Sequence, residues 1–112
     1  MFTGYFANEH KYAGMRHVSI ALYPPRGWHG EQCKCLMPSP VLLNNYKNGR
    51  CSKEEYTRIF KLQLALLDAN KIFDALGNNT VLLCYEKAGA FCHRRIVAEW
   101  FEEQLGIKVN EA

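Results

Sequence analysis

An apolar strand followed by a short loop and a helix constrains the fold of this chain more than any other segment. The strand is expected over residues 80–85, where the run VLLCY is apolar on both faces instead of alternating with polar residues. This pattern is typical of a central strand that is covered on both sides. The helix is expected over residues 92–105, with Ile96, Trp100 and its other apolar residues along one face and Gly106 at its end.

Further strands are predicted on both sides of this segment. Residues 1–7 (MFTGYFA) and 17–23 (HVSIALY) are rich in aromatic and β-branched side chains, which favour strands. Residues 8–15 between them are expected to form a loop, and residues 107–109 are expected to add an edge strand. These strands and the central one predict a small sheet.

Local capping signals predict the helices. Ser39 precedes a proline and begins a helix over residues 40–46, a capping box at Ser52 begins a second helix, and the stretch Asp68-Ala69-Asn70 offers a cap for a third over residues 71–76. The order of strand, helices, strand and helix predicts an α/β fold, a small three-layer domain with a short, mostly parallel sheet flanked by helices. In such folds ligands bind at the carboxyl ends of the strands.

Composition limits the classes to which the protein belongs. The 112 residues, 48% apolar and 22% charged, are sufficient for one domain over residues 1–112. Apolar runs are too short to cross a bilayer, and the five cysteines do not form the even set of a disulfide framework, so we expect a cytoplasmic protein with no membrane partner. A net charge of +3 is too mild to indicate a nucleic-acid partner.

A long irregular segment covers residues 24–40 (PPRGWHGEQCKCLMPSP). It contains four prolines and two glycines and lacks a sustained hydrophobic period. Because long loops within small domains are more often functional than idle, we expect it to form a lid or rim. Trp28 in this segment is suited to stacking on a base, or alternatively to pinning the loop to the domain.

The start of the last helix is the predicted site. Its first residues are Cys92, His93, Arg94 and Arg95, and a helix start attracts anions and stabilises a thiolate, which lowers the pKa of a cysteine from about 8.5. A structural role for Cys92, packed against a buried and inert Cys84, is the alternative. Consecutive helical residues point in different directions, so we expect at most one arginine to face the site and Arg94 to lie largely off the apolar face.

No metal or other cofactor is predicted. Cys33 and Cys35 could combine with Cys92 and His93 to provide enough zinc ligands, but a Cys-x-Cys pair lacks the usual spacing of two to four residues. We therefore expect the purified protein to hold no stoichiometric metal.

Four stretches of the sequence carry a family resemblance. MFTGYFA, VSIALYPPRGW, YKNGRCSKEEYTR and LLCYEKAGAFCHRRIVAEWFEE, in this order, resemble the small bacterial and phage proteins of domain-of-unknown-function family 488. The last stretch is the most specific. The resemblance implies a compact α/β domain whose distinctive residues converge on the loop over residues 86–91. It also implies that Glu86 lines a pocket and that residues 3–6 lie beside it.

Three hypotheses for the function follow. The first is binding of a phosphorylated small molecule, a nucleotide or nucleoside derivative, at residues 86–95. The residues assigned to this ligand are Tyr5, Phe6, Trp28, Tyr85, Lys87, Arg94 and Arg95.

The second hypothesis is an enzyme in which Cys92 is the nucleophile and His93 or Glu86 assists it on a nucleotide, glycosidic or thio substrate. The Cys-x5-Arg signature of cysteine phosphatases is absent from the sequence. The third is a phage or plasmid regulator that binds a host protein or a nucleic acid. Oligomeric state is left open by the sequence.

Overall fold

A parallel sheet forms the centre of the molecule in the computed structural model, which describes residues 1–87, 89 and 91–112. The strand order is β3-β2-β4-β1-β5, and every strand pair is parallel. The strands are β1 (Phe2–Tyr5), β2 (Arg16–Ser19), β3 (Glu31–Gln32), β4 (Thr80–Cys84) and β5 (Asn110–Glu111). β4 is central, and all its residues are buried, as its apolar sequence predicts.

The register aligns the carboxyl ends of the central strands. Cys84, the last residue of β4, lies opposite Tyr5 of β1, and Leu83 lies opposite Ser19 of β2. Because all strands run in the same direction, the segments that follow them leave the sheet at one edge. The sequence from Ile20 onward and the chain after Cys84 therefore meet at this edge.

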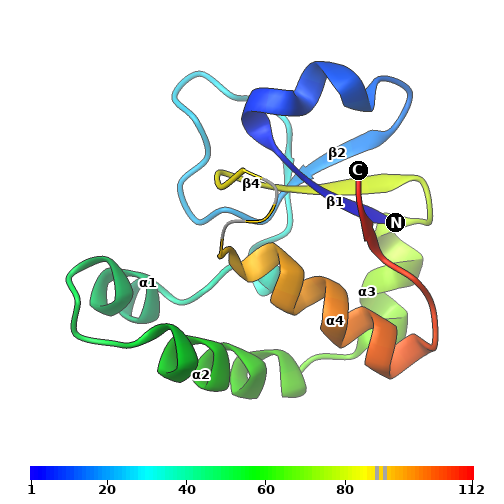
Figure 1. Ribbon diagram of the computed structural model, residues 1–112. Helices are drawn as coiled ribbons and strands as arrows, with labels where there is room; N and C mark the ends of the chain where they lie inside the picture. Colours follow the sequence, from blue (N-terminus) through cyan, green and yellow to red (C-terminus); the bar gives the residue numbers. More distant parts are fainter. Residues whose placement is uncertain (88, 90) are drawn as a thin grey trace.

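Four α-helices cover one face of the sheet, and a 3-10 helix covers the other face (Figure 1). The helices α1 (Pro40–Lys47), α2 (Lys53–Ala65), α3 (Ala69–Leu76) and α4 (His93–Leu105) lie on one side. The opposite side carries the 3-10 helix η1 (Phe6–Tyr12). The three-layer α/β architecture is as predicted, although one outer layer is a 3-10 helix.

The alternation of β4 side chains divides the core in two. Leu82 packs in the main cluster with residues of the helices, such as Phe60 and Phe101. Val81 and Leu83 point to the other face, where they pack with Tyr12 of η1. A strand with large apolar side chains on both faces has to be covered on both faces, which is why β4 occupies the centre.

The predicted loop over residues 8–15 is wrong in its first part, since η1 occupies it as far as Tyr12. Tyr12 is 2% exposed, and its hydroxyl accepts hydrogen bonds from the Tyr5 backbone N–H and from Asn8 Nδ2, both at 3.3 Å. The ring lies so close to Gly4 that a Cβ there would come within 2.6 Å of it. Tyr12 also packs with Val81 and Leu83 of β4, so the position of η1 depends on a contact between distant parts of the chain.

Helix boundaries follow the capping signals closely. Ser39 accepts a hydrogen bond from Leu42 N at 3.1 Å, Ser52 from Glu55 N at 3.0 Å and Asp68 from Lys71 N at 3.2 Å. These side chains satisfy donors that a helix start leaves unpaired. At the other end, Gly106 has φ +65°, a left-handed conformation that favours glycine and ends α4.

Four predictions about the strands and the segments between them need correction. β1 ends at Tyr5, so residues 6 and 7 belong to η1 instead of the first strand, and β2 ends at Ser19 instead of Tyr23. The segment over residues 24–40 contains β3 and the short 3-10 helix η2 (Lys34–Leu36), and β3 is held there because Cys33 N donates to Ser19 O at 3.0 Å. The last strand is Asn110–Glu111 instead of residues 107–109, with Ala112 N donating to Thr3 O at 2.7 Å.

Among the described residues, no helix combines the length and apolar character needed to span a membrane.

Candidate functional site

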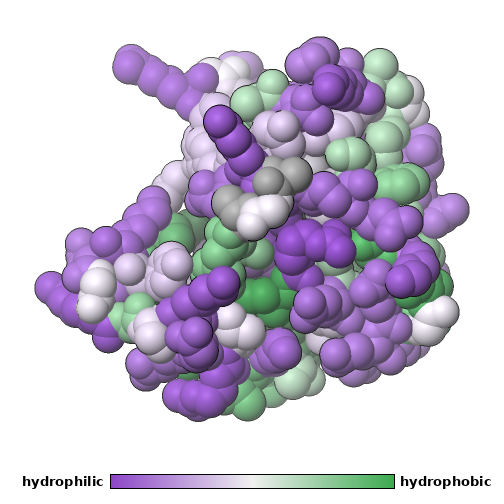
Figure 2. Space-filling model, in the orientation of Figure 1, coloured by the Kyte–Doolittle hydropathy of each residue, from purple (hydrophilic) through white to green (hydrophobic). Residues whose placement is uncertain are grey.

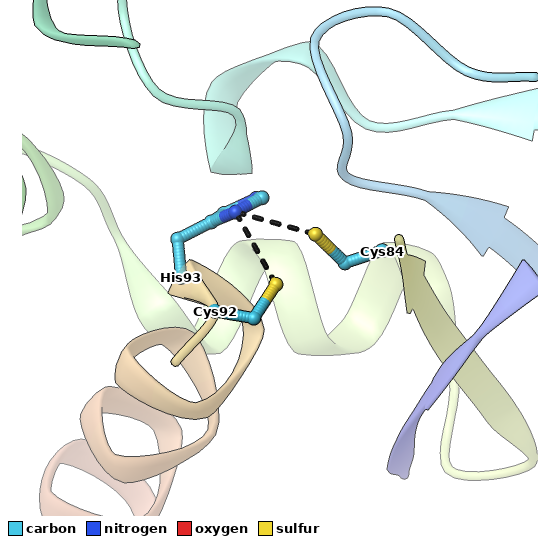
Figure 3. A group of neighbouring side chains, drawn as sticks. All are labelled: Cys84, Cys92 and His93. Atoms are coloured by element: carbon cyan, nitrogen blue, oxygen red, sulfur yellow. Dashed lines mark hydrogen bonds between the residues drawn. The ribbon is translucent and has the colours of Figure 1, made fainter. Parts of the chain in front are cut away.

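Two thiols and an imidazole meet at the carboxyl edge of the sheet (Figure 3). Cys84 ends β4, Cys92 is the N-cap of α4, and His93 is the first residue of α4. His93 Nδ1 lies 3.5 Å from Cys84 Sγ and 3.8 Å from Cys92 Sγ. All three residues are buried. The strand and the helix thus bring together side chains from the two ends of the intervening loop.

The orientation of His93 is fixed by the end of β2. Its Nε2 lies 2.6 Å from the carbonyl oxygen of Ile20. A carbonyl oxygen only accepts hydrogen bonds, so Nε2 carries the proton, and in the neutral ring Nδ1 is the acceptor that faces both thiols. The ring also packs edge to face on Phe60 of α2, with the ring centroids 5.4 Å apart.

The two thiols have opposite electrostatic environments. The neighbouring Cys84 thiol lowers the pKa of Cys92 most, His93 and the Arg94 backbone N–H lower it further, and burial opposes them. The pKa of Cys84 is raised, first by the neighbouring Cys92 and then by burial. Cys92 is therefore the thiol of the pair that ionises more readily, and Cys84 is the less acidic one.

A cavity of about 320 Å³ opens beside this cluster. Cys84, Cys92 and His93 lie in its wall, and five of the other eleven lining residues are aromatic. The aromatic residues are Tyr23, Tyr46, Tyr56, Tyr85 and Phe91. Figure 2 shows an indentation on the left of the molecule, between the body that holds the sheet and the lobe formed by α1. Glu86 and Lys47 supply a carboxylate and an ammonium group to the cavity lining.

The aromatic wall comes from elements far apart in the sequence. The ring centroids of Tyr46 in α1 and Tyr56 in α2 are 5.0 Å apart, and Phe91 lies 5.5 Å and 5.6 Å from them. Lys53 Nζ lies 5.0 Å from the Phe91 ring centroid. Phe91 lies within the predicted ligand loop over residues 86–95, but Tyr46 and Tyr56 were not predicted, because no spacing or motif in the sequence places α1 and α2 over the end of β4.

Of the predicted site residues, the structure brings four to the cavity: Cys92, His93, Glu86 and Tyr85. Cys84, expected to be inert, joins them. Its position as the last residue of a central parallel strand is the signal that could have identified it, because ligand sites form at that edge.

Other predicted ligand-binding residues lie elsewhere. Phe6 and Trp28 pack in the second cluster, with ring centroids 5.5 Å apart, and Trp28 Nε1 donates to the Glu9 carboxylate at 3.3 Å. Trp28 therefore pins its loop to the domain, the alternative considered from the sequence. Tyr5 and Lys87 are also absent from the cavity lining among the described residues.

The prediction that Arg94 lies largely off the apolar face of α4 is wrong. It is 1% exposed, and Nε and Nη2 donate to the Glu111 carboxylate at 3.1 Å and 2.7 Å. After α4 the chain returns to the sheet as β5, which places Glu111 beside Arg94. The spacing of apolar residues along α4 does not reveal this pairing. Arg95 Nη1 donates to Thr3 Oγ1 at 2.8 Å and Val109 O at 3.1 Å. Neither arginine lines the cavity in the described part of the chain.

One group of residues within the described chain has ligand atoms arranged for a metal ion, namely Cys84, Cys92 and His93, whose ligand atoms lie within 4.8 Å of one another. The zinc combination weighed from the sequence does not form there. Cys33 and Cys35 have their sulfur atoms 3.6 Å apart but are not part of this group.

Fold and site together define a small parallel α/β domain with a thiol and imidazole centre at the carboxyl edge of its sheet. The chain belongs to the DUF488 family, because the model of DUF488-N3a, described as the active DUF488-N3 subclade, matches residues 6–105. The match extends from η1 to the end of α4 and includes all three residues of the cluster. No curated protein and no solved structure matches the chain.

Proposed function

We propose that this protein is a cysteine-dependent enzyme that acts on a nucleotide or nucleoside derivative bound in the cavity. The observation that carries the proposal is the arrangement of His93, whose Nε2 is held by Ile20 O while Nδ1 faces Cys92. A nucleophile beside a base, with the base oriented by a third group, is the arrangement that activates cysteine in covalent catalysis. The subclade's description as active supports an enzyme over a binding protein.

The chemistry begins with the Cys92 proton. His93 Nδ1 takes it, and the thiolate then lies at the N-terminus of α4, where the helix dipole and the Arg94 backbone N–H stabilise it. The thiolate attacks an electrophilic atom of the substrate, a bond from sulfur to that atom forms, and the bond to the leaving group breaks. The proton held by His93 passes to the leaving group. His93 then takes a proton from water, whose oxygen bonds to the substrate atom as the bond from that atom to sulfur breaks, and His93 returns the proton to the Cys92 thiolate.

The cavity lining supports the substrate class. Tyr46 and Phe91 present ring surfaces on which a nucleobase can stack, an interaction worth about 1–3 kcal/mol per base in proteins that bind single strands. Glu86 can accept hydrogen bonds from sugar hydroxyls or from the edge of a base. Lys47 can pair with one anionic group. Arg94 and Arg95 bind Glu111, Thr3 and Val109 instead of lining the cavity. With Lys47 as the cation of the described lining, the cavity favours a nucleoside or monophosphate over a polyphosphate.

The test is turnover combined with detection of the covalent intermediate. Purified protein is incubated with a panel of nucleosides, mononucleotides, cyclic nucleotides and ADP-ribose, and products are analysed by chromatography and intact-protein mass spectrometry. We expect turnover of at least one compound, a mass adduct on Cys92, and loss of both with Cys92→Ala. Cys51→Ala, a change in the turn between α1 and α2, is the control.

A second candidate is a non-catalytic nucleotide-binding protein, favoured by the aromatic lining alone. It requires ligand-induced stabilisation with no turnover. If Cys92→Ala retained both binding and turnover, the role of Cys92 would be refuted. If binding occurred without turnover in the unaltered protein, the second candidate would replace the first.

A further inference from the structure

The three atoms at the centre of the site also have the spacing of zinc ligands. Zinc binds cysteine sulfur at about 2.3 Å and histidine nitrogen at about 2.0–2.1 Å in tetrahedral geometry, which separates a nitrogen ligand from a sulfur ligand by about 3.6 Å. His93 Nδ1 lies 3.5 Å from Cys84 Sγ and 3.8 Å from Cys92 Sγ. The atoms therefore require little rearrangement to surround one ion (Figure 3).

The outer surroundings of His93 suit a metal ligand. Nε2 donates to Ile20 O at 2.6 Å, which leaves Nδ1 unprotonated on the side of the two sulfur atoms. Histidine ligands in metal sites usually donate their other N–H to a carboxylate or backbone carbonyl, which fixes the ring and the tautomer. The Ile20 carbonyl provides this support before any ion is bound.

A divalent cation can reach the three residues, and their net charge suits it. Cys84, Cys92 and His93 all line the cavity, so an ion can reach them. The buried guanidinium group of Arg94 does not act as an uncompensated positive charge, because Glu111 binds it through two hydrogen bonds. Two thiolates and a neutral imidazole would balance the charge of a divalent cation.

We propose that Cys84, Cys92 and His93 form a binding site for Zn²⁺, and that the bound ion inhibits the enzyme. The binding site is independent of the proposed function, whereas the inhibition rests on it. Two Zn–S bonds and one Zn–N bond form, and any proton remaining on either thiol is released to solvent. Both the nucleophile and its base are then engaged by the metal, and Cys92 has no free thiolate with which to attack.

The binding test uses chelator-treated protein and zinc alone. Zn²⁺ is titrated in competition with a chromogenic chelator, and Co²⁺ is added separately to detect the thiolate-to-metal absorption band. We expect one equivalent of metal per chain. Cys84→Ser and His93→Ala should each weaken binding at least tenfold, since each removes one ligand. The double variant Cys33→Ser and Cys35→Ser, which changes one half-buried and one exposed thiol outside the group, should bind as the unaltered protein does.

Inhibition is tested on the same samples. Zn²⁺ should protect Cys92 from alkylation and abolish turnover, and added chelator should restore both. Circular dichroism of Cys84→Ser and His93→Ala establishes that these variants are folded; if either is unfolded, the Co²⁺ absorption band of the unaltered protein decides the ligand set.

The outcomes separate the two proposals. Absence of stoichiometric binding, or equal binding by folded Cys84→Ser, overturns the zinc site, and a reactive Cys92 with turnover would leave the proposed function intact. If zinc binds and turnover requires it, the inhibitory role and the nucleophilic role of Cys92 both fail. Zinc binding with no turnover under any condition would preserve the site and overturn the proposed function.

Discussion

His93 donates a hydrogen bond to the carbonyl oxygen of Ile20 over 2.6 Å, which joins the first turn of α4 to the chain that leaves β2. This contact joins α4 to the segment after β2 at the carboxyl end of the sheet, and it orients the imidazole ring. Without it, neither the tautomer of His93 nor its position relative to the thiols would be defined. The proposed chemistry and the proposed metal site both depend on this single bond.

Cys92 should alkylate faster than Cys84 at neutral and mildly acidic pH. The pKa of Cys92 is lowered and that of Cys84 is raised, so only Cys92 has a substantial thiolate fraction below the pKa of free cysteine. Iodoacetamide labelling at each residue, followed by peptide mass spectrometry from pH 5 to pH 9, measures the two rates. Equal and slow labelling would show that Cys92 is a structural thiol.

Cys84→Ala should slow that labelling of Cys92. The change removes the neighbouring thiol that contributes most to the low pKa, so the pKa of Cys92 rises and its thiolate fraction at pH 6 falls, by about tenfold for each unit of increase. Above the new pKa the two proteins should label at similar rates. An unchanged pH profile would mean that Cys84 does not stabilise the thiolate.

Leu82→Ala should destabilise the protein by about 2–5 kcal/mol, because it leaves a cavity in the middle of the central strand. Leu82 is 0% exposed, whereas Leu66 at the end of α2 is 88% exposed. Leu66→Ala is thus a matched control, expected to change the free energy of unfolding by no more than about 0.5 kcal/mol. Urea denaturation measures both, and similar losses would contradict the central position of β4.

Glu111→Gln should lower stability by about 1–3 kcal/mol, since it removes the charge that compensates the buried guanidinium group of Arg94. Burial raises the pKa of Glu111, but hydrogen bonds from Arg94 and Thr3 outweigh it, and the net pKa is lowered from 4.5. The contribution is therefore fully present above pH 4.5 and is lost as the pH falls through the folded pKa.

Thermal unfolding from pH 3 to pH 7 checks this pairing. The difference in melting temperature between Glu111→Gln and the unaltered protein should be largest near neutral pH and should shrink under acidic conditions. A difference that is constant across this range would mean that the ion pair is not its cause.

The sequence predicts the parts of the fold that depend on local interactions. Caps at Ser39, Ser52 and Asp68 involve residues three positions apart, and β4 shows its burial directly in its apolar run. In contrast, η1 depends on the packing of Tyr12 against β4. Such contacts join distant residues and leave no periodic pattern in the sequence.

The same distinction applies to the site. Cys92 and His93 were identified because the start of a helix has a recognisable local signal. Cys84 could be recognised only by combining a strand assignment with the rule that parallel strands present ligand sites at their carboxyl ends. The pairing of Arg94 with Glu111 depends on the path of the chain after α4, so the expectation that Arg94 lies largely off the apolar face is wrong.

Tyr46→Ala should reduce the stabilisation of the protein by a nucleotide-type ligand, whereas Trp28→Ala should retain it. Tyr46 lines the cavity beside the thiol and imidazole centre, while Trp28 packs with Phe6 on the other face of the sheet. Loss of one stacked ring should weaken binding by about 1–3 kcal/mol, roughly fivefold to more than a hundredfold. The measurement is the ligand-induced change in melting temperature, taken for each variant relative to its own ligand-free state so that intrinsic destabilisation cancels. The opposite result, with binding lost in Trp28→Ala and kept in Tyr46→Ala, would move the ligand to the η1 face and separate it from Cys92.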